Sequence, residues 1–172
     1  SDLLFTPSPD GDENLIAEGV DPARIHRVGN VMIDSLVGAL ERVRPRRKCA
    51  DLGLAAGDYG LVTLHRPSNV DDPDRLAGLL DGLVALDFPL VFPVHPRTRK
   101  VMDAAGLSDR YRGPRSGRLH LCEPLGYDDF LSLTVDARLV ITDSGGIQEE
   151  TTFLRIPCLT LRPNTERPVT VA

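Results

Sequence analysis

Short apolar runs alternate with longer amphipathic stretches through the last two thirds of the chain. The apolar runs predict buried strands at residues 59–64, 90–94, 119–122, 139–142 and 158–161. The stretches between them carry apolar residues at helical spacing and predict helices at residues 72–86, 98–105, 127–135 and 146–154. Strands that alternate with helices form parallel sheets, because right-handed crossovers bring successive strands side by side. We therefore expect an α/β fold with a Rossmann-like, doubly wound parallel sheet.

The first third of the chain has a looser pattern. It predicts short strands at residues 3–5 and 24–28 and helices at residues 10–20 and 31–43. Residues 44–58, which are rich in charge, proline and glycine, are expected to form a linker with one short turn. Because the chain begins without methionine inside an expected strand, we interpret it as part of a longer protein.

Composition narrows the possible partners. The chain has 172 residues, enough for one domain or slightly more, and its net charge of −5 argues against general binding to nucleic acid or anionic membranes. No apolar run approaches the roughly 18 residues of a membrane span. The three scattered cysteines form no CxxC motif, which favours reduced thiols in a cytoplasmic protein over a disulfide framework or a zinc site.

Unusual polar residues follow the expected strands. In open parallel α/β sheets, ligands bind beyond the carboxyl ends of the strands, so these residues are expected to line one rim. They comprise His65-Arg66-Pro67-Ser68-Asn69, His95-Pro96-Arg97, Glu123-Pro124, Asp143-Ser144-Gly145-Gly146 and Arg162. Two histidines, each followed by an arginine within two residues, suit an anionic ligand. Ordinary polar loops are the alternative to a binding site at these positions.

Residues 141–150 carry the most specific chemical signal. Gly145 and Gly146 have no Cβ, so the backbone can approach a ligand closely, and the helix expected here offers unpaired amides and a positive dipole end to a phosphate. Glu150 lies four residues after Gly146, about one helical turn. A carboxylate there could accept both hydroxyls of a ribose, which favours a nucleotide or a nucleotide sugar. Ser-Gly-Gly is also a common turn, and acidic residues are frequent in the first turn of any helix.

Several familiar nucleotide and metal motifs are absent. The chain has neither the Gly-x-Gly-x-x-Gly fingerprint of dinucleotide-binding enzymes nor the Gly-x-x-x-x-Gly-Lys-Ser/Thr loop of P-loop NTPases. Asp71, Asp72 and Asp74 lack the glycine and terminal glutamate of an EF-hand, and their position before a proline fits a helix N-cap better. The sequence therefore predicts that the protein uses no nicotinamide, flavin or metal cofactor.

The order of these segments resembles that of one family. The resemblance rests on Phe5-Thr6-Pro7-Ser8, Val28-Gly29-Asn30, Thr63-Leu64-His65-Arg66, Pro93–Thr98, Pro124–Tyr127, Thr142–Glu150 and Arg162–Pro168. Over nearly its whole length the chain is similar to the C-terminal half of the non-hydrolysing UDP-N-acetylglucosamine 2-epimerases. The resemblance implies a glycosyltransferase-B-like architecture, in which two Rossmann-like domains hold the nucleotide sugar between them. Residues 1–45 would then border a missing N-terminal domain, and residues 46–172 would form the C-terminal, UDP-binding domain.

The resemblance also implies roles for particular residues. His65 would assist catalysis beside the diphosphate and the sugar. The substrate-binding residues would be Ser144, Gly145 and Gly146 on the phosphates, Glu150 on the ribose, Leu125 and Phe130 on the uracil, and Arg167 on the nucleotide sugar, with Arg66, Asn69 and His95 as further contacts. In this family UDP is eliminated to give a 2-acetamidoglucal and then adds back, which inverts the acetamido carbon. That chemistry needs neither NAD nor a metal.

Two features separate the chain from many intact members. Ser68 stands where many members have glutamate, and the family's acidic residues that move the C2 proton belong to the N-terminal half. Activity is therefore expected to require that half. A retaining glycosyltransferase of the same architecture and a non-catalytic UDP-sugar-binding module are the alternatives. For the full-length protein we expect a homodimer that binds UDP-N-acetylglucosamine and UDP and serves cell-surface polysaccharide synthesis, with no nucleic-acid or membrane partner.

Overall fold

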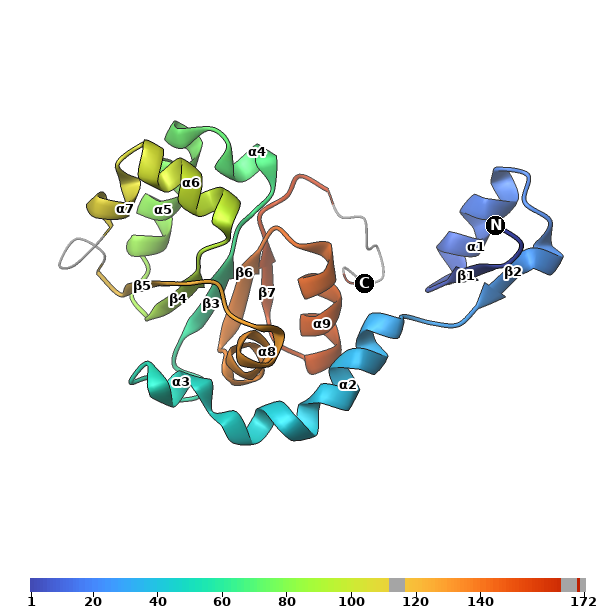
Figure 1. Cartoon of the computed structure of the whole chain (residues 1–172), viewed down its shortest axis with the longest axis horizontal. Helices are drawn as coiled ribbons and strands as arrows, with labels where there is room; N and C mark the ends of the chain where they lie inside the picture. Colours follow the sequence, from blue (N-terminus) through green and yellow to red (C-terminus); the bar gives the residue numbers. More distant parts are fainter. Residues whose placement is uncertain (112–116, 165–169, 171–172) are drawn as a thin grey trace. The chain divides into compact units, whose positions relative to one another are not determined.

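The computed structural model describes residues 1–111, 117–164 and 170 (Figure 1). The chain divides into two compact units, Ser1–Leu40 and Glu41–Ala172. The sheet that the apolar runs predict lies in the second unit. The assignment of residues 1–45 to the border of a further domain stays a prediction.

The first unit combines two short strands with one helix. Its elements are β1 (Leu4–Thr6), α1 (Pro9–Ala17), a 3₁₀ turn (Pro22–Arg24) and β2 (Ile25–Arg27). β1 and β2 pair in parallel, with Leu4 opposite Ile25. Asp12 on α1 accepts hydrogen bonds from Thr6 Oγ1 and, at 2.8 Å, from Arg27 Nε. These hydrogen bonds tie the helix to both strands.

The second unit alternates strands and helices. It is preceded by α2 (Val31–Val43), which includes the division between the units and has the bounds that its apolar spacing predicts. The following elements are a 3₁₀ turn (Arg44–Arg46), α3 (Lys48–Asp51), β3 (Gly60–Thr63), α4 (Pro67–Val70), α5 (Pro73–Val84), β4 (Leu90–Pro93), α6 (Pro96–Ala104), α7 (Leu107–Arg110), β5 (Leu119–Cys122), α8 (Tyr127–Asp136), β6 (Leu139–Thr142), α9 (Gly145–Leu154) and β7 (Cys158–Thr160).

Among the described residues, five strands of this unit form one parallel sheet in the order β5-β4-β3-β6-β7 (Figure 1). The chain proceeds from β3 through β4 to β5 and then returns to the other side of β3 with β6 and β7. β3 and β6 are therefore neighbours, and Thr63 lies opposite Thr142. The arrangement confirms the predicted Rossmann-like sheet. Its topological switch point lies between β3 and β6, where such sheets bind ligands.

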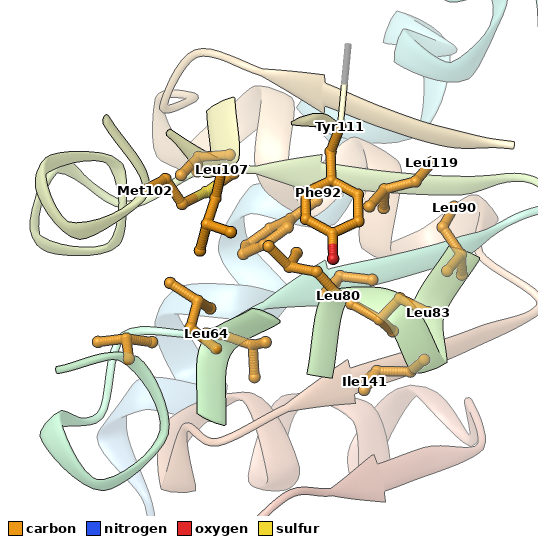
Figure 2. Packing of buried hydrophobic residues seen from close by; sticks show 14 residues of the cluster. Leu64, Leu80, Leu83, Leu90, Phe92, Met102, Leu107, Tyr111, Leu119 and Ile141 are labelled. Carbon is orange, nitrogen blue, oxygen red and sulfur yellow. The ribbon is translucent and has the colours of Figure 1, made fainter. Parts of the chain in front are cut away.

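Two hydrophobic clusters cover the faces of the sheet. Along β4, Val91 belongs to one cluster and Phe92 to the other, because successive side chains of a strand point to opposite faces. Figure 2 shows the cluster of Phe92, to which α5 contributes Leu80 and α6 contributes Met102. α8 contributes Leu133 to the cluster of Val91. Helices thus pack on both faces, as expected for a doubly wound sheet.

The helices differ from the sequence expectation where they are short or begin with proline. α4 and α7 were not predicted, because a single turn is too short to show helical periodicity. α6 begins at Pro96, two residues before its predicted start, since proline is favoured at the first position of a helix. Across the described ranges, no helix combines the length and the apolar character that a membrane crossing requires.

Candidate functional site

The carboxyl ends of β3 and β6 meet at Asp143. Its side chain is completely buried at the end of β6. It accepts hydrogen bonds from the backbone N–H groups of His65, at 3.1 Å, and Arg66, at 2.9 Å, and from Asn69 Nδ2 at 3.1 Å. Its Oδ1 also lies 3.1 Å from His65 Nδ1. Asp143, which the sequence marked only as the end of a strand, thus organises the loop after β3.

The same network extends to the end of β7. The Asn69 amide donates a second hydrogen bond, at 2.8 Å, to the carbonyl of Leu161, which follows β7. Burial alone would raise the pKa of Asp143, but the hydrogen bonds from the His65 side chain, the Arg66 N–H and the Asn69 amide outweigh it and lower that pKa below its ordinary value. Through its two hydrogen bonds, Asn69 in the loop after β3 connects the ends of β6 and β7. Its expected contact with substrate stays a prediction.

The lowered pKa of Asp143 predicts an acid-labile contribution to stability. A carboxyl group with a lower pKa in the folded state stabilises the protein above its unfolded pKa of about 3.9, and this contribution is lost as pH falls through the folded value. The difference in unfolding free energy between wild type and Asp143→Asn should be largest near neutral pH and should shrink below about pH 4. Urea unfolding of both proteins across this range measures it. A difference that does not change with pH would contradict the prediction.

His65 and His95 lie next to each other at the carboxyl ends of β3 and β4. Their ring centroids are 5.6 Å apart. His95 occupies the N-cap of α6, where its Nδ1 accepts a hydrogen bond from the Arg97 N–H at 3.2 Å. In the neutral ring the proton of His95 is therefore on Nε2, which can donate to a ligand. The sheet brings together the two histidines that the sequence places at strand ends.

The turn between β6 and α9 presents backbone amides near the same strand ends. Ser144 occupies the N-cap, and the helix begins with Gly145 and Gly146. Within the described ranges the Ser144 side chain makes no capping hydrogen bond, so the first amides of α9 can serve another acceptor. The helix is 10 residues long, and the positive end of its dipole lies at this turn. The geometry suits a phosphate group.

Glu150 lies on α9 one turn after Gly146 and is only 4% exposed. Its Oε1 is 3.5 Å from the Tyr127 hydroxyl, whereas its buried Oε2 has no hydrogen-bond partner among the described residues. Burial raises the pKa of Glu150, the Tyr127 hydrogen bond opposes this shift, and the charge of Glu149 adds to it. Buried polar atoms normally have a partner, so Oε2 suits a hydroxyl donor from a ligand.

Leu125 and Phe130 are half-buried residues at the start of α8. Leu125 precedes this helix and Phe130 lies in its first half. Both pack against the same hydrophobic cluster as Ile147 of α9, so they are near the helix that carries the glycine turn. Their contact with uracil stays a prediction. Arg167, expected to contact the nucleotide sugar, lies outside the described residues.

The whole chain matches one protein family. A family model described as UDP-N-acetylglucosamine 2-epimerase matches residues 1–172. The chain belongs to this family. The match confirms the resemblance that the motifs carry, and it places the glycine turn, Glu150 and the histidine pair in a family named for its action on a UDP-sugar.

Two relatives and one crystal structure illustrate the similarity. UDP-N-acetylglucosamine 2-epimerase of Methanocaldococcus jannaschii is 38% identical, over 99% of this chain and 48% of the relative. UDP-2,3-diacetamido-2,3-dideoxy-D-glucuronate 2-epimerase of Pseudomonas aeruginosa is also 38% identical, over 96% of this chain and 45% of the relative. The crystal structure of the M. jannaschii epimerase in complex with UDP-GlcNAc and UDP superimposes with a TM-score of 0.88 at 38% identity and covers 99% of this chain and 48% of that one. The chain therefore spans about half the length of these relatives.

Proposed function

We propose that the full-length protein is an isomerase that interconverts UDP-N-acetylglucosamine and UDP-N-acetylmannosamine by elimination and re-addition of UDP. This chain supplies the nucleotide-binding half. The observation that carries the proposal is the buried Glu150 carboxylate, which lies one helical turn behind a glycine turn with available amides. This pairing suits a ribose next to a phosphate, and the family membership supports a UDP-sugar as the ligand.

Each part of the site has a task in this chemistry. Elimination leaves negative charge on the departing UDP, and the amides of Gly145 and Gly146 at the helix N-terminus are placed to stabilise that charge. His65 assists departure and return of UDP from the end of the neighbouring strand. His95 offers an Nε2 donor beside it. Arg167 and the acidic residues of the other half complete the site in this proposal.

A second UDP-sugar is an alternative candidate substrate. The P. aeruginosa relative, at the same 38% identity, is named for UDP-2,3-diacetamido-2,3-dideoxy-D-glucuronate. Both named substrates carry UDP and both names describe inversion at C2. The features of this chain that we assign to UDP serve either sugar equally, so the choice rests on contacts outside the nucleotide.

The test is an incubation of the full-length protein with each UDP-sugar separately and without an acceptor, followed by NMR of the sugar C2 configuration. Formation of UDP-N-acetylmannosamine from UDP-N-acetylglucosamine supports the proposal, and turnover of the diacetamido sugar alone selects the second candidate. A retaining glycosyltransferase would epimerise neither sugar. A binding module would take up UDP and leave both sugars unchanged.

The 172-residue chain on its own is expected to bind UDP but to produce no detectable epimer. The reason is that the cleft has only one of its two walls and the proton-transferring acidic residues of the family belong to the other half. Isothermal titration with UDP and the NMR assay on the same sample check both parts. Robust conversion by this chain alone would contradict the expectation that epimerisation requires the other half of the protein. UDP affinity should also be lower than in the full-length protein, since part of the contacts is lost.

The homodimer, the cytoplasmic location and the role in cell-surface polysaccharide synthesis remain predictions for the full-length protein. Size-exclusion chromatography with light scattering measures the first directly. A monomer at micromolar concentration would contradict it.

A further inference from the structure

The two carboxylate oxygens of Asp143 have different hydrogen-bond donors. Oδ2 accepts from the Arg66 N–H at 2.9 Å and from Asn69 Nδ2 at 3.1 Å. Oδ1 faces the ring of His65, with 3.1 Å to Nδ1. The His65 N–H lies 3.1 Å from both oxygens. One oxygen is thus committed to the loop, while the other is available to the imidazole.

This geometry fixes the proton of the His65 ring. An ionised carboxylate only accepts hydrogen bonds, so a ring nitrogen at hydrogen-bond distance from it must be the donor. The proton of the neutral ring then lies on Nδ1, and Nε2 is left with a lone pair for a ligand. A carboxylate that holds a histidine in this manner sets both its tautomer and its orientation.

We propose that Asp143 is a positioning residue that acts on the reaction through His65, by holding the ring with Nδ1 protonated and Nε2 directed to the reacting groups. This inference rests on the proposed function, in which His65 assists departure and return of UDP. Its neighbour His95 carries the opposite tautomer, because its Nδ1 accepts from the Arg97 backbone. The two rings therefore offer a ligand one acceptor and one donor.

Asp143→Asn separates this role from a purely structural one. The amide keeps the shape of the carboxylate but replaces one oxygen by a donor. Two N–H donors, from Arg66 and Asn69, converge on Oδ2, so the amide oxygen should stay there and the NH₂ group should face His65 Nδ1. Nδ1 must then accept, and the proton moves to Nε2. The variant inverts the tautomer with little change in shape.

The kinetic test uses the full-length protein with the epimerisation assay. Asp143→Asn is expected to lower kcat by about 100-fold or more, with KM changed less than about threefold, because the loss concerns the reacting groups and not ground-state binding. Asp143→Asn combined with His65→Asn is expected to be no slower than His65→Asn alone. Independent, multiplying losses would overturn the proposal, since Asp143 would then act without His65. So would wild-type activity per folded Asp143→Asn molecule.

A matched control is Asp81→Asn. Asp81 is a half-exposed carboxylate on α5 that is paired with Arg110 and with the Tyr111 hydroxyl at 2.6 Å, in a different part of the unit. Its replacement is the same chemical change at a hydrogen-bonded carboxylate away from the site, and it should leave kcat unchanged. A loss in kcat as large as that of Asp143→Asn would show that replacing any hydrogen-bonded carboxylate slows this protein, and would overturn the specific role of Asp143.

A spectroscopic test is independent of turnover. ¹⁵N NMR of the imidazole nitrogens in the full-length protein, well above the ordinary histidine pKa of about 6.5 and with His65→Asn to assign the signals, reads the tautomer. We expect Nδ1–H in the wild type and Nε2–H in Asp143→Asn. Nε2–H in the wild type would overturn the proposal even if the variant did not fold. If instead the protein converts no UDP-sugar while the tautomer is as expected, the proposed function is wrong. The conclusion that Asp143 fixes the tautomer of His65 is then still supported.

Discussion

Replacement of His65 by asparagine in the full-length protein is expected to lower kcat by about 100-fold or more, while the affinity for UDP changes less than about threefold. The reason lies in the placement of the ring, which Asp143 holds at the end of β3 beside the switch point of the sheet. An interaction made mainly in the transition state appears in kcat and not in ground-state binding. Steady-state kinetics and UDP titration on the same preparation measure the two effects.

A structural role for His65 predicts a different result. The melting temperature would fall, and activity per folded molecule would remain near that of the wild type. Thermal unfolding of the kinetic sample therefore decides between them. His120→Asn is the matched control, because His120 is an exposed residue on the edge strand β5. It is expected to leave both kcat and stability nearly unchanged.

Replacement of Glu150 by alanine is expected to weaken UDP binding by about 1.5–3 kcal/mol, which is the range for hydrogen bonds that involve a charged group. This corresponds to a loss of roughly 10- to 150-fold in affinity. Inorganic pyrophosphate should bind almost as well as before, because it meets the amides of the glycine turn and has no ribose for the Glu150 carboxylate. Isothermal titration with each ligand measures the two affinities.

The difference between the losses in UDP and pyrophosphate affinity shows whether Glu150 contacts the ribose. Glu150→Gln keeps the size of the side chain and one acceptor oxygen, so it should lose less UDP affinity than Glu150→Ala. Equal losses for UDP and pyrophosphate would show that Glu150 supports the fold of α9 and does not contact ribose. The unequal result is expected because Glu150 Oε2 is buried and has no hydrogen-bond partner among the described residues.

Most of the fold follows from local sequence patterns. The strands at Leu119–Cys122 and Leu139–Thr142 have the predicted bounds. The second begins with three consecutive apolar residues, as is typical of a buried parallel strand, whereas the first carries the exposed His120 because β5 is at the edge of the sheet. The parallel arrangement of the strands follows from their alternation with helices. Their order, β5-β4-β3-β6-β7, does not, because right-handed crossovers are compatible with several orders. The one-turn helix α4 does not follow, since it is too short to show helical periodicity and its N-cap residue Arg66 is held by a tertiary hydrogen bond to Asp143.

The candidate site also has residues that the sequence predicts and residues that it does not. His65, His95 and the glycine turn could be found from the sequence, because each directly follows an expected strand and such ends share one rim. The role of Asp143 could not, since it depends on the register that sets Thr63 opposite Thr142 and brings together residues 78 positions apart in the chain. The tautomer of His95 likewise follows only from its position at the N-cap of α6.

UDP is expected to bind this chain at the turn between β6 and α9. A titration of the ¹⁵N-labelled chain with UDP, followed by amide NMR, tests it most directly. We expect the largest shifts at Ser144, Gly145 and Gly146, with smaller ones toward Glu150. Unchanged amides at this turn, with shifts gathered instead around the cavity of about 370 Å³ lined by Thr152 of α9 and Cys158 and Thr160 of β7, would contradict it.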